Sequence, residues 1–264
     1  MARSSSFKNI LKLIDSETGA VLPHESFLSD LKRSIELEDR KTAGVASKTY
    51  KPSGMNCIRA SYYQIKGYAP DNDEASYNLI GICNSGSDIH KRIQKAVTQM
   101  KSNGMDCEYV DVAEYIKTRQ LDYLEVVGKE EFETKLYHKE LNISFLCDGI
   151  IRYKNKYYIL EIKSESGYKF LNRKDVDPKH YNQASAYSLS LKIDDVIFVY
   201  VSRDLLDMKS YCLHVTPEMR LNIEEYIHEC DSYVAKETVP PLPKDVGRVL
   251  CQYCNYKSYC VEDN

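Results

Sequence analysis

The spacing of apolar residues predicts a series of helices along the chain. In the stretch that begins at Ser87, apolar residues recur every three or four positions, Ser87 is a suitable N-cap, and Gly104 is a suitable stop. Asp177-Pro178 is typical of a helix start, because proline is favoured at the first helical position. The predicted helices span residues 7–14, 25–39, 62–68, 87–101, 111–118, 177–191 and 217–236.

Apolar runs rich in β-branched residues predict strands between these helices. Two such runs, 141–153 and 157–162, are separated by Lys154-Asn155-Lys156, which indicates a β-hairpin. A third run, 196–202, is apolar throughout and predicts a strand buried on both faces. With further strands at 107–110, 124–127 and 211–215, this order of elements predicts an α/β fold in which a mixed central sheet is flanked by helices.

Composition narrows the class of protein. Of 264 residues, 43% are hydrophobic and 28% are charged, which excludes a collagen-like or disordered chain. No run approaches the ~18 apolar residues that span a bilayer, and the first residues lack the apolar region of a signal peptide. We therefore expect a cytoplasmic protein of a prokaryotic cell or a phage-infected host, without membrane contact. The expected organisation is a helical N-terminal region (1–50), a core (51–238) and a C-terminal cysteine segment (239–264).

Charge is distributed unevenly along the chain. The formal net charge of -3 excludes a uniformly basic coat protein for nucleic acid, but not a local basic patch. Residues 151–180 carry eight Lys or Arg against four Asp or Glu. A polyanion such as DNA is therefore expected to bind here. The predicted DNA contacts in this window are Arg152, Lys169, Arg173, Lys174 and Lys179.

The cysteines indicate a metal centre. Nine cysteines, an odd number in a chain without an export signal, argue against a disulfide framework. Cys251, Cys254 and Cys260 have the spacing Cys-x2-Cys-x5-Cys, from which three thiolates can converge on one metal centre. Cys57, in a loop-like segment, is the best-placed fourth ligand, and the alternative is a zinc knuckle completed by His or water. The remaining cysteines, Cys83, Cys107, Cys147, Cys212 and Cys230, are expected in the core.

The hairpin carries the residues of greatest chemical interest. If Lys154-Asn155 is a two-residue turn, Asp148 lies directly opposite Glu161, with Cβ atoms ~5 Å apart. Two carboxylates so close repel each other unless a cation lies between them. Lys163, on the same face as Glu161, can then orient a metal-bound water and stabilise charge on a scissile phosphate. The alternative is a surface hairpin whose charges are merely solvated.

Two helices bear further candidates. His90 lies at the boundary between the apolar and polar faces of its helix, where it either reaches a cleft or forms local hydrogen bonds. His180, Gln183 and Tyr187 are spaced three and four residues apart and share a helix face. That face is either a polar exterior or a support for Lys163 or a phosphate.

Five motifs occur along the chain: Gly86-x3-His90, Asp148-Gly149, Glu161-Ile162-Lys163, Gln183-x3-Tyr187 and the cysteine pattern. Together they resemble the motifs of the RecB-like nucleases of the PD-(D/E)xK superfamily. The likeness is greatest to the iron-sulfur branch, which includes the CRISPR-associated Cas-four-type exonucleases and the AddB nuclease domain. It covers roughly residues 54 to 260 and implies that the core is a restriction-endonuclease-like nuclease core.

This resemblance also implies roles for individual residues. A Mg2+ or Mn2+ ion would be held by His90, Asp148, Glu161 and the carbonyl of Ile162. Lys163 would be catalytic, with support from Gln183 and Tyr187. An additional acid used by some relatives would be Glu131 or Glu133, between which the sequence does not decide. A 4Fe-4S cluster would be bound by Cys57, Cys251, Cys254 and Cys260.

The function expected from the resemblance is that of a metal-dependent DNA nuclease. It would act as an exonuclease, with endonuclease activity as an open addition, on DNA with a single-stranded end. Its setting would be recombination, repair, phage replication or CRISPR adaptation, with protein partners in those pathways. Two alternatives stay open: a nucleic-acid-binding module without turnover, and a zinc-containing adaptor protein.

Overall fold

A computed structural model describes residues 23–41, 47–71, 75–242, 251–252 and 254–262. The chain divides into two compact units, one from residues 1–44 and 74–83 and the other from 45–73 and 84–264. In the first unit, helix α2 (Pro23–Lys41) contributes Glu36, whose carboxylate accepts a hydrogen bond from the Tyr77 main-chain nitrogen at 3.0 Å. None of the helices in the described part of the chain combines the length and apolar character needed to cross a membrane.

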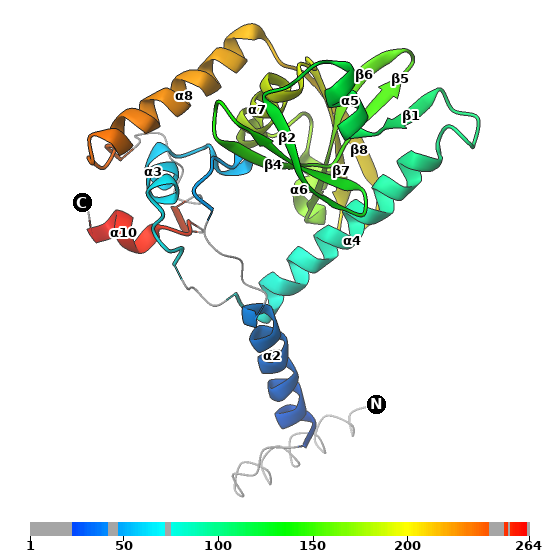
Figure 1. The fold of residues 1–264 in the computed structure, drawn as a ribbon. Coiled ribbons are helices and arrows are strands. Elements are labelled where there is room, and N and C mark those ends of the chain that lie inside the picture. Colours follow the sequence, from blue (N-terminus) through cyan, green and yellow to red (C-terminus); the bar gives the residue numbers. More distant parts are fainter. Residues whose placement is uncertain (1–22, 42–46, 72–74, 243–250, 253, 263–264) are drawn as a thin grey trace, which may run out of the picture. The chain divides into compact units, whose positions relative to one another are not determined.

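The second unit is built on a five-stranded sheet of order β1-β5-β6-β7-β8 (Figure 1). Strands β6 and β7 are parallel, and every other neighbouring pair is antiparallel. This mixed sheet confirms the predicted fold class. Its strands are β1 (Cys107–Val110), β5 (Gly149–Tyr153), β6 (Lys156–Glu165), β7 (Asp195–Ser202) and β8 (Met208–His214).

Helices cover both faces of this sheet, because apolar side chains alternate along β5 and β6. Ile151 and Ile162 pack with Ile89 and Ile93 of α4 (Tyr77–Gln99), whereas Ile150 packs with α7 on the opposite face. Figure 1 shows α7 and α8 on one side of the sheet and α4 on the other. The other helices of this unit are η1 (Pro52–Gly54), α3 (Ile58–Lys66), α5 (Val112–Thr118), α6 (Gly167–Asn172), η2 (Pro178–His180), α7 (Tyr181–Leu191), α8 (Pro217–Ala235) and α10 (Lys257–Glu262).

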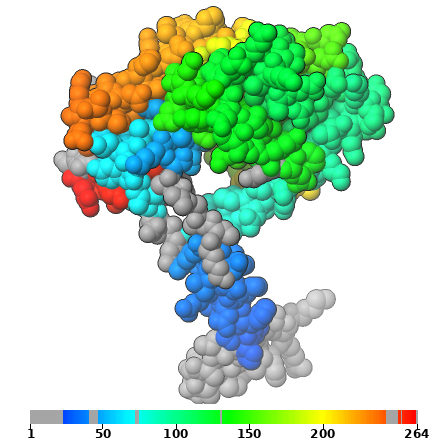
Figure 2. Space-filling model, viewed as in Figure 1, coloured from blue at the N-terminus to red at the C-terminus, as the bar shows by residue number. Residues whose placement is uncertain are grey.

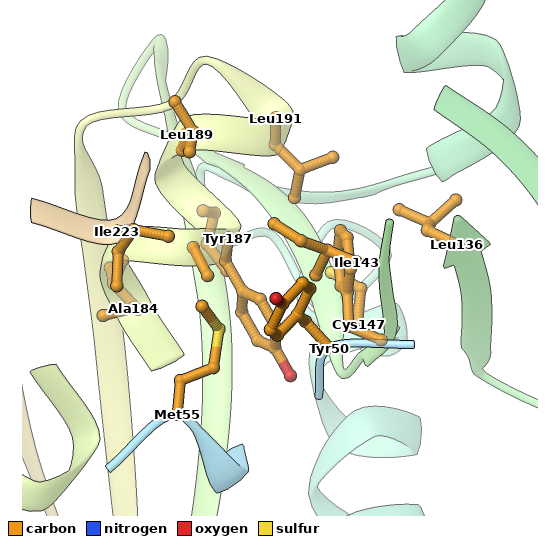
Figure 3. Packing of buried hydrophobic residues seen from close by; sticks show 14 of the residues in the cluster. Tyr50, Met55, Leu136, Ile143, Cys147, Ala184, Tyr187, Leu189, Leu191 and Ile223 are labelled. Carbon is orange, nitrogen blue, oxygen red and sulfur yellow. The ribbon is translucent and has the colours of Figure 1, made fainter. Parts of the chain in front are cut away.

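A second, three-stranded antiparallel sheet consists of β2 (Leu124–Glu130), β3 (Glu133–His138) and β4 (Ile143–Cys147). The side chains of Tyr50, Met55 and Tyr187 point into one buried cluster with Ile143 and Cys147 of β4 (Figure 3). The main core therefore joins this sheet to α7 and to the segment that precedes α3.

The structure corrects several predicted elements. The run 141–153 is two strands in different sheets, β4 and β5, and Asp148 lies between them. Helix α4 begins at Tyr77, so Ser87 lies inside it and is not an N-cap, although Gly104, with φ +84°, does follow its end. Strand β3 and helix α6 were not predicted. Cys83 and Cys212 are exposed, not in the core. The predicted helix 7–14 lies outside the described residues.

Candidate active site

The β5-β6 hairpin positions the two carboxylates. Lys154 and Asn155 form its turn with φ values of +48° and +63°, as a type I′ turn requires. Gly149 pairs with Leu160, and this register places Asp148 across from Glu161, as the sequence predicts. The Oδ2 atom of Asp148 accepts a hydrogen bond from the main-chain nitrogen of Ile162 at 2.7 Å. The turn and the strand alternation thus bring both acids and the Ile162 backbone to one place.

Two side chains that the sequence analysis missed hold the Asp148 backbone. Gln94 Nε2 and the Tyr109 hydroxyl contact the Asp148 carbonyl oxygen at 2.9 and 3.0 Å. The Tyr109 ring fits there because the next residue is glycine: a Cβ on Gly149 would lie 2.6 Å from the ring. In the sequence, only the pair Asp148-Gly149 pointed to a close contact here, and it did not identify Tyr109 as the aromatic residue in contact.

His90 and a second acid complete a group that could hold a metal ion. One ligand atom from each of His90, Glu133 and Asp148 lies within 4.8 Å of the others. His90 Nδ1 is 3.3 Å from Asp148 Oδ1 and 3.8 Å from Glu133 Oε1. Glu131, the other acid considered, is exposed and lies 3.6 Å from Lys91 Nζ. Although burial disfavours the imidazolium, the neighbouring carboxylates of Asp148 and Glu133 raise the pKa of His90 to about 10.

Glu161 is buried and only half satisfied. Its Oε1 atom accepts a hydrogen bond from Gln183 Nε2 at 2.8 Å and lies 2.6 Å from Lys163 Nζ. Its Oε2 atom is buried and has no hydrogen-bond partner among the described residues. Burial, together with the charge of Asp148, raises the pKa of Glu161 to about 7. A buried carboxylate oxygen without a donor is costly, and a cation beside it would remove that cost.

The predicted support for Lys163 comes from α7. Lys163 Nζ donates to Gln183 Oε1 at 2.9 Å, and Gln183 Nε2 donates to the Tyr187 hydroxyl at 2.9 Å. The Tyr187 hydroxyl donates in turn to the main-chain oxygen of Leu146 at 2.9 Å. Gln183 and Tyr187 are one helical turn apart, so both reach the same end of β6. This chain of contacts fixes the ammonium group beside Glu161.

The four predicted cluster ligands lie near one another. Cys57 is the N-cap of α3, and the neighbouring thiolates of Cys57, Cys260 and Cys251 add to burial in raising the pKa of Cys254. The C-terminal segment lies against α3 (Figure 2), where the rings of Tyr63 and Tyr259 are 5.7 Å apart. The start of α3 and the C-terminal segment, which carry these cysteines, are therefore packed together.

The predicted DNA contacts differ in their surroundings. The Arg173 guanidinium is largely buried, bonds the carboxylate of Glu165 at 2.7 Å, and lies 4.1 Å from the centre of the Tyr200 ring. Its donors are therefore committed within the protein. Arg152 is exposed but lies 2.7 Å from Glu108. The exposed lysines of the set are Lys169, Lys174 and Lys179.

Comparisons with known proteins give remote likenesses. No protein-family model and no curated protein sequence matches the chain. A crystal structure of SSO0001 matches with a TM-score of 0.45 and 16% identity, over 88% of this chain and 96% of that one. The alkaline exonuclease LHK-Exo from Laribacter hongkongensis matches with a TM-score of 0.38 over 73% of this chain and 90% of the enzyme, at 11% identity, or 12% in its complex with dAMP. Similarity at this level says nothing about function, so we infer function from the side chains.

Proposed function

We propose that this chain is a DNA nuclease that depends on a divalent cation, of the RecB-like, PD-(D/E)xK type with an iron-sulfur cluster. The observation that carries the proposal is the buried Oε2 atom of Glu161, which lacks a partner among the described residues. It belongs to a site that also contains Asp148 and an ammonium group, that of Lys163. A structural ion pair would satisfy both oxygens of a buried carboxylate, whereas a cation site leaves one available.

The residues suited to hold the cation are His90, Glu133, Asp148 and Glu161, with the Ile162 carbonyl as a further expected ligand. Carboxylate oxygens are the ligands that Mg2+ and Mn2+ prefer. A bound divalent cation would activate the attacking water and neutralise charge on the scissile phosphate. Because Asp148 and Glu133 raise the pKa of His90, its imidazolium would have to lose a proton to become a ligand.

Lys163 has the geometry of a group that stabilises charge on the phosphate. Gln183 Oε1 and Glu161 Oε1 hold its Nζ atom, so the ammonium group is already in position before the reaction begins. Gln183 acts as a positioning residue, because its amide contacts both Lys163 and Glu161. Tyr187 fixes the orientation of that amide. The complete set favours an enzyme over a binding module without turnover.

The cysteine cluster is proposed to hold a 4Fe-4S centre on Cys57, Cys251, Cys254 and Cys260. Cys57, Cys251 and Cys260 lie near enough to Cys254 to raise the pKa of its thiol, as is expected if the four bind a single centre. This proximity also supports cysteine, not His or water, as the fourth ligand. Such a centre would tie the C-terminal segment to α3 and therefore serve a structural role. Iron content and visible absorbance of anaerobically purified protein separate this centre from zinc.

The test is cleavage of end-labelled single- and double-stranded DNA with Mn2+, with Mg2+ and with EDTA. We expect cleavage only with a divalent cation, and a loss of at least about 100-fold in Lys163→Ala with DNA binding retained. The matched control is Lys139→Ala, an exposed lysine of the β3-β4 turn. Normal turnover by Lys163→Ala would contradict the catalytic assignment. Equal cleavage in EDTA would contradict the cation site.

A further inference from the structure

A small pocket of about 170 Å3 adjoins the candidate active site. Lys163 belongs to both, because its side chain contacts Glu161 and also lines the pocket. The pocket walls come from the end of β6, from α6, from η2 and from the end of β7. Its remaining polar lining includes Ser164, Ser166, Lys169, Lys179, His180 and Arg203.

The lining of the pocket carries more basic than acidic side chains. Lys169 and Arg203 take part in no ion pair with the described residues, and Lys179 is 3.7 Å from its nearest acid, Asp177. The one acid in the lining, Glu165, is bound by the Arg173 guanidinium at 2.7 and 2.8 Å. An anion that enters the pocket therefore meets cations without repulsion from a free carboxylate.

These positive charges also affect the imidazole of His180, which lines the pocket. His180 stacks on Phe198, with ring centroids 6.0 Å apart. Burial and the nearby ammonium groups of Lys163 and Lys179 lower the pKa of His180 to about 3. The ring is consequently neutral at physiological pH and offers a hydrogen bond without adding to the charge.

Size and chemistry limit what the pocket can hold. Its volume exceeds the ~30 Å3 of a single water several-fold and falls below the ~300 Å3 at which pockets begin to enclose whole small molecules. Hydroxyl groups, ammonium groups and a guanidinium are the usual partners of phosphate oxygens. The Arg203 guanidinium donates a hydrogen bond to the Ser164 carbonyl oxygen at 3.2 Å, which holds it at the pocket.

We propose that this pocket binds a second phosphate group of the DNA strand, next to the phosphate that is cleaved, through Lys169, Lys179 and Arg203. This inference rests on the proposed function and adds a positioning subsite to it. Contacts to a phosphate fix the register of a nucleic acid on a protein without reading its sequence. Because Lys163 lines the pocket, the strand held there presents its neighbouring phosphate to the carboxylates.

The test measures DNA binding in EDTA, so that it is independent of cleavage. Fluorescence anisotropy of a 3′-labelled single-stranded oligonucleotide is followed from 50 to 300 mM salt for the full chain and for Lys169→Ala and Lys179→Ala. Each variant is expected to weaken binding by about tenfold and to reduce the slope of log K against log salt by about 0.7. The control, Lys139→Ala, is expected to match the wild type. Thermal unfolding of every variant shows that the fold is kept.

Two arms of the experiment identify the source of the phosphate. The oligonucleotide carries either a 5′-phosphate or a 5′-hydroxyl group. If the lysine variants lose affinity for both oligonucleotides, the ligand is an internal phosphodiester. If they lose affinity only for the oligonucleotide with the 5′-phosphate, the ligand is a terminal phosphate. Unchanged slopes in both lysine variants with both oligonucleotides would overturn the subsite. A wild-type protein that binds with the expected slope but cuts no DNA would overturn the proposed function and leave the subsite standing.

Discussion

The hydroxyl of Tyr109 lies 3.0 Å from the main-chain oxygen of Asp148, and its ring occupies the space that a side chain at position 149 would fill. Tyr109 belongs to β1, and its hydroxyl also donates to the Phe132 main-chain oxygen at 2.6 Å. One aromatic side chain therefore ties the residue before β5 to the β2-β3 turn, next to Glu133. We therefore expect the position of Asp148 relative to Glu133 to depend on this ring.

Gly149→Ala is expected to damage the site more than the fold. The added methyl group would displace the Tyr109 ring, since its Cβ would lie 2.6 Å from a ring atom, and Asp148 would lose a support. A shift of about 1 Å in a reacting group can cost up to about 100-fold in rate, so we expect a fall of that order in kcat for DNA cleavage. Gly128→Ala is the matched control, because the nearest atom to its Cβ would be 3.7 Å away. Equal kcat in the two variants would contradict the role given to Tyr109.

Glu161→Gln should change how the stability of the metal-free protein depends on pH. Burial raises the pKa of Glu161 in the folded state to about 7, so the folded protein binds more protons than the unfolded chain between about pH 4.5 and 7. Its stability therefore falls as pH rises through that window, and the Gln variant should lose the part of this decline that Glu161 causes, whereas the part caused by the raised pKa of His90 should stay. Melting temperatures in EDTA at pH 5 and pH 8 measure the difference. Mn2+ should raise the melting temperature of the wild type at pH 8 more than that of the variant.

Arg173 is expected to act in stability and not as a DNA contact, contrary to the sequence prediction. Arg173→Ala would leave Glu165 buried without its partner, which costs about 3–5 kcal/mol of unfolding free energy. Lys174→Ala, at the exposed neighbouring position, should stay within about 0.5 kcal/mol of the wild type. Urea unfolding of both variants tests this contrast. Similar stabilities would show that the Arg173 pair contributes little.

Cys254→Ser should remove the proposed cluster and loosen the C-terminal segment. The thiol is half-buried among Cys57, Cys251 and Cys260, so its loss leaves three ligands for the cluster. We expect loss of iron and of visible absorbance, and a lower melting temperature. Cys212→Ser, at an exposed cysteine of β8, should keep all three properties. Full iron content in Cys254→Ser would remove this residue from the ligand set.

The sequence by itself determined the local geometry of the hairpin. A two-residue turn at Lys154-Asn155 and the alternation of side chains along a strand are short-range properties, so the facing positions of Asp148 and Glu161 follow from residue counting. Helical spacing likewise brought Gln183 and Tyr187 onto one face. In each case, the residues concerned lie within one element or one turn of each other.

Only the tertiary structure decided which distant residues join that hairpin. The choice of Glu133 over Glu131, and the contacts of Gln94 and Tyr109 with Asp148, depend on how α4, β1 and β3 meet. The burial of Arg173 depends in the same way on β7, because Tyr200 covers it. The charge and periodicity of a sequence do not predict such contacts, because the contacts arise from the packing of elements that are far apart along the chain.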